Sequence, residues 1–405
     1  MARLDNVLFF ISFLDLFAAS LTVPLLSGHI KALGASHALI GLVSSTYAVL
    51  QFFSGPVVGS WSDIKGRRTI LLLTLICCSL CYLSLGFAIN ILTIICIRVV
   101  LGTLKHTQSL CRAILSDVVP PETLTEVFGR YNAISGIGFI IGPVIGGHLA
   151  EYQHGFFYVC CLSSIIFIIN LCIALIFIPK SKQRNKNEGQ RMEASLWGSI
   201  SMAVNHLRYM NWSLYWDAFS LKAMLAFSVS ILYANYSLTL QERFDLTPSA
   251  IGYSISFQSL LGAVSGFGAG AVSKIYGTEL AKLTQHGFIL LAISFIIILS
   301  CSALWLFILA LAPLAISSSI LRTALSQWSL EQAPKDQRGS VIGAQHSLSA
   351  ISRMTAPVIA GVAQSTFGPS GPVLISLLAS LAGIVIASRI HRKSKAVEGS
   401  NKKSL

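Results

Sequence analysis

The sequence predicts an all-α membrane protein in which twelve transmembrane helices form two parallel six-helix repeats. Three observations predict this fold class. Only 11% of the 405 residues are charged and 54% are hydrophobic, whereas a soluble domain carries about 25% charged residues. Long apolar runs alternate with short polar breaks, and the second half of the chain repeats part of the first. This composition excludes a soluble enzyme with a hydrated surface.

Six apolar runs fill the first half of the chain. Each is near the length of about 20 residues that a helix needs to cross the hydrocarbon core. The first run carries Asp15 and is followed by another run instead of a cleavage site, so it is not a signal peptide. The predicted helices cover residues 7–27, 38–60, 69–89, 91–115, 127–150 and 156–178. We expect them to form an N-terminal bundle within residues 1–179.

A polar stretch over residues 180–212 separates these runs from six more, and its composition is typical of a linker. The later runs predict helices over residues 213–239, 249–273, 283–301, 303–325, 340–364 and 370–388. We expect a C-terminal bundle over residues 213–388 and a basic tail over residues 389–405.

The basic residues predict the orientation of the chain. If the N-terminus is cytoplasmic, the cytoplasmic side collects nearly all Lys and Arg residues outside the helices, and the other side keeps Lys31 and Arg243. The positive-inside rule therefore places both termini and the linker in the cytoplasm. The tail carries Lys402 and Lys403, a pattern similar to the dilysine signal that retrieves proteins to the endoplasmic reticulum. That organelle is one candidate location.

The two halves are related in sequence. A shift of 211 places residues 40–66 over residues 251–277, and ten of the 27 positions are identical. About two matches are expected by chance at common residue frequencies. Parallel repeats of this kind hold a binding site near the membrane midplane, and alternating access follows when one half rocks against the other.

A glycine- and arginine-rich turn follows the second predicted helix. A glycine permits close helix approach or a tight turn, and an aspartate among arginines can form ion pairs. The run has the pattern G-x-x-x-D-x-x-G-R-R, with Gly59, Asp63, Gly66, Arg67 and Arg68 at its defined positions.

The fourth and fifth helices carry two further motifs. The fourth contains Arg98 and Gly102 in the pattern R-x-x-x-G. The fifth has the pattern G-x-x-x-G-P-x-x-G-G, built from Gly138, Gly142, Pro143, Gly146 and Gly147. Glycines at this spacing form a flat face for close helix packing, and the proline adds a pliable point.

In these motifs and their order, the chain resembles the major facilitator superfamily, and within it the tetracycline-exporter-like group of drug:proton antiporters. The resemblance implies a secondary transporter. It also implies a cytoplasmic latch in which Arg67 pairs with an acid at the end of the fourth helix, here Asp117, and Asp63 caps a helix of the other half.

Ionisable residues inside predicted spans are the candidate transport site, because a charge in the bilayer is costly. Asp15 lies roughly 12 Å and Lys105 roughly 15 Å from the cytoplasmic ends of their helices, so the two could meet. Arg98, Lys105 and Arg112 recur every seven residues and should share one face of a helix, beside His106. Asp15 is either a proton-coupling carboxylate or half of a permanent ion pair.

The second half contributes three more charges. Lys222 lies at a similar depth in its helix, and Asp217 with Arg322 forms a candidate inner gate near the cytoplasmic end. Basic residues outnumber acidic ones among these groups, so Lys105, His106 and Lys222 could bind an anionic or zwitterionic organic solute. The alternative for Lys105 and His106 is to balance Asp15.

We therefore expect a monomeric transporter in the lipid bilayer that moves a small organic molecule, with protons as the candidate coupling ion. The rival prediction is a non-transporting sensor or scaffold on the same fold. We expect no enzymatic activity, no cofactor, no metal site and no nucleic-acid partner. No Walker A motif, G-x-x-x-x-G-K-[ST], occurs in the sequence, so ATP does not drive transport through such a site.

Overall fold

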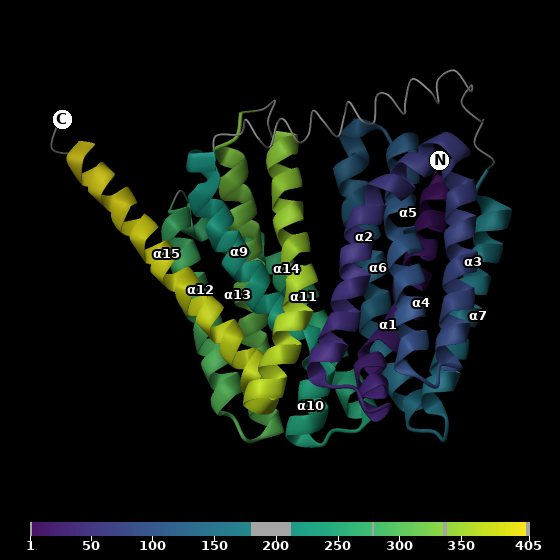
Figure 1. Cartoon of the computed structure of the whole chain (residues 1–405). Helices are drawn as coiled ribbons and strands as arrows, with labels where there is room; N and C mark the ends of the chain where they lie inside the picture. The colour runs from purple at the N-terminus through teal and green to yellow at the C-terminus, as the bar shows by residue number, and fades with distance from the viewer. Residues whose placement is uncertain (1, 180–211, 278, 335–337, 402–405) are drawn as a thin grey trace. The chain divides into compact units, whose positions relative to one another are not determined.

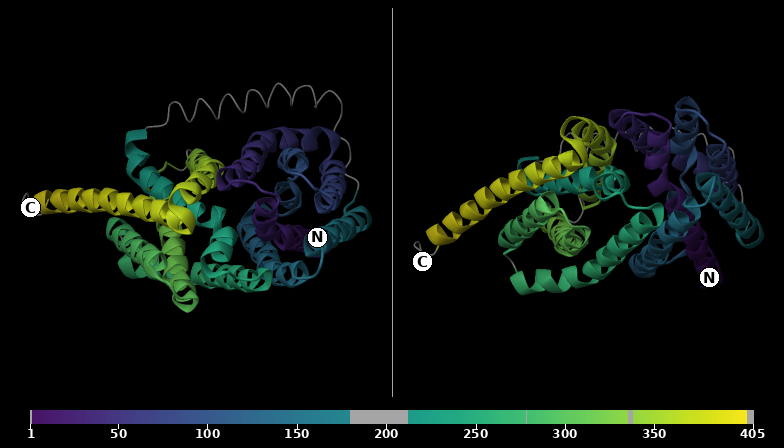
Figure 2. Two further views of the ribbon diagram at one scale, coloured as in Figure 1. Left: turned by 60° about the horizontal axis from the view of Figure 1, so that its bottom comes forward. Right: turned by 90° about the horizontal axis from the view of Figure 1, so that it is seen from below.

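The computed structural model describes residues 2–179, 212–277, 279–334 and 338–401. Most of the predicted linker and both lysines of the dilysine pattern lie outside these residues. The described chain is helical and has no strand, as the views in Figures 1 and 2 show. A helical structure suits the lipid bilayer, because a helix satisfies its own backbone hydrogen bonds and lipid tails offer none.

The first six spans are built from seven helices. They are α1 (Ala2–Ala32), α2 (His37–Lys65), α3 (Arg67–Gly86), α4 (Ile91–Leu104), α5 (Thr107–Val118), α6 (Pro121–Ala150) and α7 (Gly155–Phe177). Helix α2 begins after Ser36, whose hydroxyl accepts a hydrogen bond from the Leu39 amide. Asn90 caps α4 in the same way through the Thr93 amide.

The second six spans contain α9 (Trp212–Ala234), α10 (Tyr236–Phe244), α11 (Pro248–Tyr276), α12 (Leu280–Ser300), α13 (Leu304–Glu331), α14 (Arg338–Phe367) and α15 (Gly371–Asn401). Eleven stretches of the described residues are long and apolar enough to cross a membrane. The last stretch, residues 341–392, holds both α14 and α15, which a short 3-10 turn at Gly368–Ser370 separates. The prediction of twelve membrane helices is therefore confirmed.

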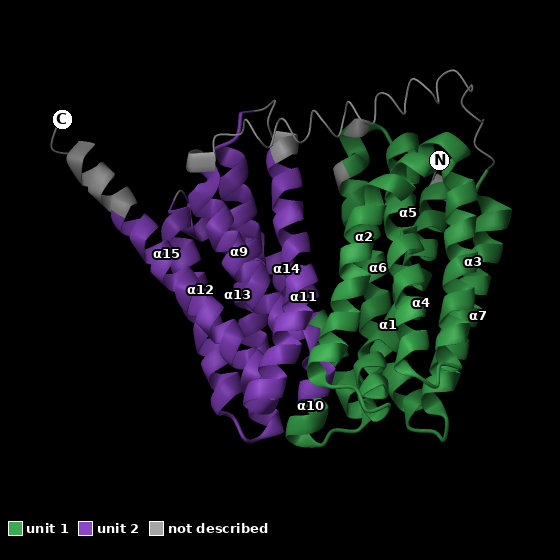
Figure 3. Ribbon diagram, in the orientation of Figure 1, with its two compact units in different colours: residues 1–200, 240–259 green, residues 201–239, 260–405 purple. Residues whose placement is uncertain are grey.

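The helices form two compact units, coloured separately in Figure 3. Unit 1 contains residues 1–200 and 240–259, and unit 2 contains residues 201–239 and 260–405. Unit 1 thus includes α10 residues and the start of α11, which the sequence places in the second repeat. Gly147 of α6 packs against the backbone of Pro248, and Gly252 packs against the carbonyl of Pro143. These glycines let α11 approach α6 more closely than a Cβ atom would allow.

Large apolar side chains cover the outside of both units. Examples with more than 60% of their surface exposed are Phe53, Val57, Phe267 and Trp305. In water such a surface would aggregate, whereas lipid tails solvate it. The buried polar residues lie between helices, and they form the candidate site.

Candidate functional site

The polypeptide breaks its helix at Lys105. The α4 helix ends at Leu104 and α5 begins at Thr107. The membrane span predicted over residues 91–115 is confirmed as Ile91–Val118, but it is interrupted at residues 105–106. Side chains of α2 stabilise the break by donating hydrogen bonds to carbonyl groups that lose their helical partners there. The Gln51 amide donates to the Lys105 carbonyl at 3.2 Å, and the Ser54 hydroxyl donates to the Gly102 carbonyl at 3.2 Å. Neither proline nor glycine stands at residues 105–106, so no local sequence signal predicts the break.

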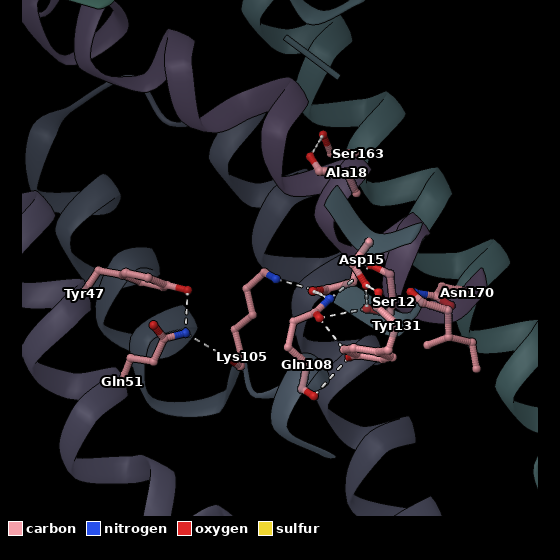
Figure 4. Close-up of polar contacts among 12 residues, drawn as sticks. Ser12, Asp15, Ala18, Tyr47, Gln51, Lys105, Gln108, Tyr131, Ser163 and Asn170 are labelled. Carbon is pink, nitrogen blue, oxygen red and sulfur yellow. Dashed lines mark hydrogen bonds and ion pairs between the residues drawn. The ribbon is translucent and has the colours of Figure 1, made fainter. Parts of the chain in front are cut away.

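The break aims the Lys105 side chain at Asp15 of α1 (Figure 4). The Lys105 Nζ atom donates to Asp15 Oδ1 at 2.8 Å, and the Asp15 side chain is completely buried. Gln108 of α5 donates from Nε2 to the other carboxylate oxygen, Oδ2, at 3.0 Å. Both oxygens of Asp15 therefore accept a hydrogen bond. The structure brings together the two charges that the sequence singled out.

Further side chains hold Gln108 in place, and the sequence analysis missed all of them. The hydroxyl groups of Ser12 and Tyr131 each donate to Gln108 Oε1 at 2.8 Å. These donors fix the orientation of the amide, so its Nε2 atom faces Asp15. Uncharged polar residues carry no distinctive pattern in an apolar run, which is why they escaped prediction.

The pair is electrically neutral and shielded from solvent. Taking a carboxylate and an ammonium out of water is costly, and only their mutual attraction and good hydrogen bonds compensate. Removing one partner would leave the other charge buried and uncompensated. Asp15 and Lys105 are thus energetically linked, and a change in the protonation of one changes the interaction of the other.

Arg98 and Arg112 diverge from this pair. The Arg98 guanidinium lies 4.1 Å from the ring centroid of Tyr47 in α2, and Arg112 donates to Asn132 in α6 at 2.9 Å. The helix is interrupted between Arg98 and Arg112, so the shared face of Arg98, Lys105 and Arg112 stays a prediction. His106, at the break, lies 2.8 Å from the Ser54 hydroxyl through its Nε2 atom.

Unit 2 holds its own buried lysine. Lys222 of α9 donates to the Ser326 hydroxyl of α13 at 3.0 Å and to the Oε1 atom of Gln345 in α14. Both partners are uncharged. In the described part of the chain no ion pair joins Asp217 to Arg322, so the structure does not bring the predicted inner-gate pair together. Asp217 is half-buried and Arg322 is exposed.

The motif after α2 forms a compact ionic cluster. Gly66 ends α2 with a φ of 93°, a backbone conformation that favours glycine. Arg67, at the start of α3, donates to Asp63 at 2.8 Å and also pairs with Asp117 at the end of α5. Arg68 donates to the Leu175 carbonyl at 2.7 Å. Gly59, by contrast, has open space where a Cβ atom would lie.

Three glycines of the α6 motif pack against α1. A Cβ atom on Gly138 would lie 2.7 Å from the Phe17 backbone nitrogen of α1. Gly142 and Gly146 likewise leave no room for a Cβ atom against α1, at Ser20 and Leu21. Since the backbones touch, the glycines hold α1 and its Asp15 at a fixed position.

The end of α6 carries a polar contact outside the spans. Glu151 accepts a hydrogen bond from the Ser249 hydroxyl at 2.6 Å and another from the Ser249 amide at 3.3 Å. The side-chain bond from Ser249 is the main cause that holds the pKa of the Glu151 carboxyl below its ordinary value of 4.5. Elsewhere in unit 1, the His37 Nε2 atom lies 2.6 Å from the Glu242 carboxylate.

Comparison with known sequences adds family relationships to this geometry. The profile of the Major Facilitator Superfamily matches residues 8–285 and 218–404. The quinolone resistance protein NorA of Staphylococcus aureus (strain MRSA252) is 24% identical over 383 residues, which are 94% of both chains. The class H tetracycline resistance protein of Pasteurella multocida is 26% identical over 260 residues, 63% of each chain.

Solved structures share the fold. A bacterial homolog of the human lysosomal transporter Spinster, in an inward-facing and occupied conformation, has a TM-score of 0.78 at 15% identity and covers 98% of this chain and 97% of its own. The human organic anion transporter MFSD10 (TETRAN) has a TM-score of 0.65 at 21% identity and covers 95% of this chain and 99% of its own. At these identities the likeness concerns the fold alone.

Proposed function

This chain belongs to the major facilitator superfamily and is a secondary transporter, and we propose that it moves a small organic anion or zwitterion in exchange for, or together with, protons. Family members of this kind move a solute by alternating access between the two sides of the membrane. The proposal concerns what the solute is and which groups couple it to protons.

The charge of the interior carries the proposal about the solute. Among the described residues, the buried side chains with a full charge are Asp15, Arg98, Lys105 and Lys222. Three are cationic and one is anionic. Since an uncompensated charge in a low-dielectric interior is unfavourable, a negatively charged group on the solute would be stabilised there. One structural relative is named as an organic anion transporter, which supports the same class.

Asp15 is the proposed proton-coupling group. Protonation would remove its negative charge and weaken its attraction to Lys105, which lies 2.8 Å away. Lys105 would then be free to interact with a solute, and His106 lies beside it in the helix break. A permanent structural ion pair is the competing role.

The cytoplasmic latch and the orientation are also proposals. With both termini in the cytoplasm, the cluster of Arg67, Asp63 and Asp117 lies on the cytoplasmic side. Opening that side would require its ion pairs to rearrange. Asp217 and Arg322 would act as an inner gate only in a state that brings them closer than the one described above.

Uptake into vesicles tests transport directly. The purified protein is reconstituted into liposomes, and a labelled mixture of organic anions and zwitterions is added with and without an imposed pH gradient. We expect wild-type protein to accumulate at least one solute, and more of it with the gradient. Protein-free vesicles and the Lys105→Ala variant, taken from its monodisperse fraction, are the controls. Absence of uptake by folded protein would favour a sensor or scaffold.

A further inference from the structure

Lys222 lies buried in unit 2, and no carboxylate of the described residues pairs with it. Its side chain is 9% exposed, and its Nζ atom donates to the neutral acceptors Ser326 and Gln345. No ion pair of Lys222 exists among the described residues. Neutral oxygens orient an ammonium group but do not neutralise it, so the positive charge remains uncompensated.

The lysine also determines how Gln345 is oriented. An ammonium group only donates hydrogen bonds, so the Gln345 amide must present its oxygen to Lys222. The amide nitrogen, Nε2, then points elsewhere. It is buried, on a side chain only 5% exposed, and no described residue forms a hydrogen bond with it. A buried N–H group without an acceptor is unfavourable and rare.

Unused donors therefore surround Lys222 on three helices, α9, α13 and α14. Lys222 has three N–H bonds and uses two of them, and the Gln345 amide uses neither of its own. The hydroxyl of Ser326 accepts from Lys222 and keeps its own hydrogen to donate. A water molecule could accept one of these hydrogens, but it brings no negative charge.

A second positive charge reinforces the need for an anion. Arg322 lies one helical turn before Ser326 in α13 and repels Lys222 electrostatically. Arg322 is exposed and solvent can screen it, so Lys222 is the charge that requires a partner. One negative charge with two acceptor oxygens meets these donors, and a carboxylate has both.

We propose that Lys222, Ser326 and Gln345 form a binding subsite for the carboxylate group of an organic anion. This inference rests on the proposed function, because the subsite would hold the charged end of the transported solute. It assigns a role to two uncharged residues, Ser326 and Gln345. It also separates the anion-binding lysine, Lys222, from Lys105, whose charge Asp15 already neutralises.

Thermal unfolding of the purified full-length protein tests binding without transport. The probe is sodium benzoate, compared with sodium chloride and sodium sulfate at equal ionic strength. We expect benzoate to raise the unfolding temperature in a saturable way and the inorganic salts to raise it less. Lys222→Met should lose this response. A benzoate response of equal size in wild type and Lys222→Met would overturn the subsite, as would the lack of any response in wild type.

A second variant supplies the anion within the chain. Gln345→Glu places a carboxylate beside Lys222, so it should raise the unfolding temperature without benzoate and abolish the benzoate response. Ser349→Ala is the matched control, because Ser349 lies one turn further along α14 and bonds only to the Gln345 carbonyl. The control should respond like wild type. An unfolding temperature of Gln345→Glu below that of wild type would contradict the proposal.

The two proposals can fail separately. If benzoate binding depends on Lys222 but no solute accumulates in vesicles, the result supports the subsite and contradicts the proposed transport. If wild type and Lys222→Met accumulate solute equally, and benzoate inhibits that uptake equally in both, the result supports transport and contradicts the subsite.

Discussion

Among the described residues, each unit of the molecule buries one lysine, and the two lysines have different partners. In unit 1 Lys105 pairs with the carboxylate of Asp15 at 2.8 Å, and Gln108 donates to the second oxygen of that carboxylate. In unit 2 the hydrogen-bond partners of the Lys222 ammonium within the described ranges are the uncharged Ser326 and Gln345. One charge is thus neutralised inside the protein and the other is not. A buried lysine therefore indicates an anionic ligand only where no carboxylate of the protein already neutralises it.

Removing the lysine of unit 1 should have the largest effect. Lys105→Met leaves the Asp15 carboxylate buried without its counter-charge, so we expect a loss of about 3–5 kcal/mol in the free energy of unfolding. The double variant Lys105→Met with Asp15→Asn removes both charges and should recover much of that loss. Thermal unfolding in detergent measures both. If the single and double variants were equally unstable, lost packing and not lost pairing would explain the effect.

The packing of unit 1 should give the next largest effect. Gly138→Ala places a Cβ atom 2.7 Å from the Phe17 backbone nitrogen, and such overpacking costs about 1–3 kcal/mol. Gly136→Ala is the matched control in the same helix, and Gly343→Ala is the control in unit 2, because neither Cβ atom would meet a neighbour within 4 Å. Both controls should unfold at or slightly above the wild-type temperature. Equal losses in all three variants would reject close packing as the cause.

Removing the lysine of unit 2 should change stability little. Lys222→Met leaves no carboxylate behind and removes an uncompensated charge, which offsets the hydrogen bonds lost by Ser326 and Gln345. We expect a change within about 1 kcal/mol of wild type. The same unfolding measurement compares it with Lys105→Met. A loss as large as that of Lys105→Met would mean that Lys222 has a counter-charge and that the two units do not differ.

Loss of the Glu151–Ser249 contact, outside the spans, should have the smallest effect on the unfolding temperature, and this effect should depend on pH. The pKa of Glu151 is held below 4.5 in the folded protein by Ser249, so the fold favours the ionised form. That contribution is complete above the ordinary pKa and is lost as the pH falls through the lower, folded value. Glu151→Gln should therefore unfold slightly below wild type at neutral pH and at the same temperature in acid. A difference that grew on acidification would have the wrong sign.

The sequence was sufficient to predict most of the fold. Twelve apolar runs and their lengths are physical requirements of crossing a bilayer, so the helices fall close to the predicted ranges. The helix break at Lys105 was not predictable, because its stabilising groups, Gln51 and Ser54, come from α2 and act only in three dimensions. The assignment of residues 240–259 to unit 1 likewise depends on tertiary packing.

Only the charged residues of the candidate site could be predicted from the sequence. Asp15, Lys105 and Lys222 stand out because charged residues are rare in apolar runs. Gln108 and Gln345 do not stand out, since glutamine occurs in such runs without a set role. The predicted stripe of Arg98, Lys105 and Arg112 assumed an unbroken helix, which the structure does not have. The Asp217–Arg322 gate was predicted only from the similar depth of the two residues in their helices.

If Asp15 couples solute movement to protons, the dependence of uptake on a pH gradient must change when its carboxylate is removed. Uptake of a solute that wild-type vesicles accumulate is measured in wild type and Asp15→Asn, with and without the gradient. We predict that wild type accumulates more solute with the gradient, whereas Asp15→Asn exchanges solute at a rate that the gradient does not change. An Asp15→Asn variant with wild-type gradient dependence would contradict the claim and leave Asp15 as a structural partner of Lys105.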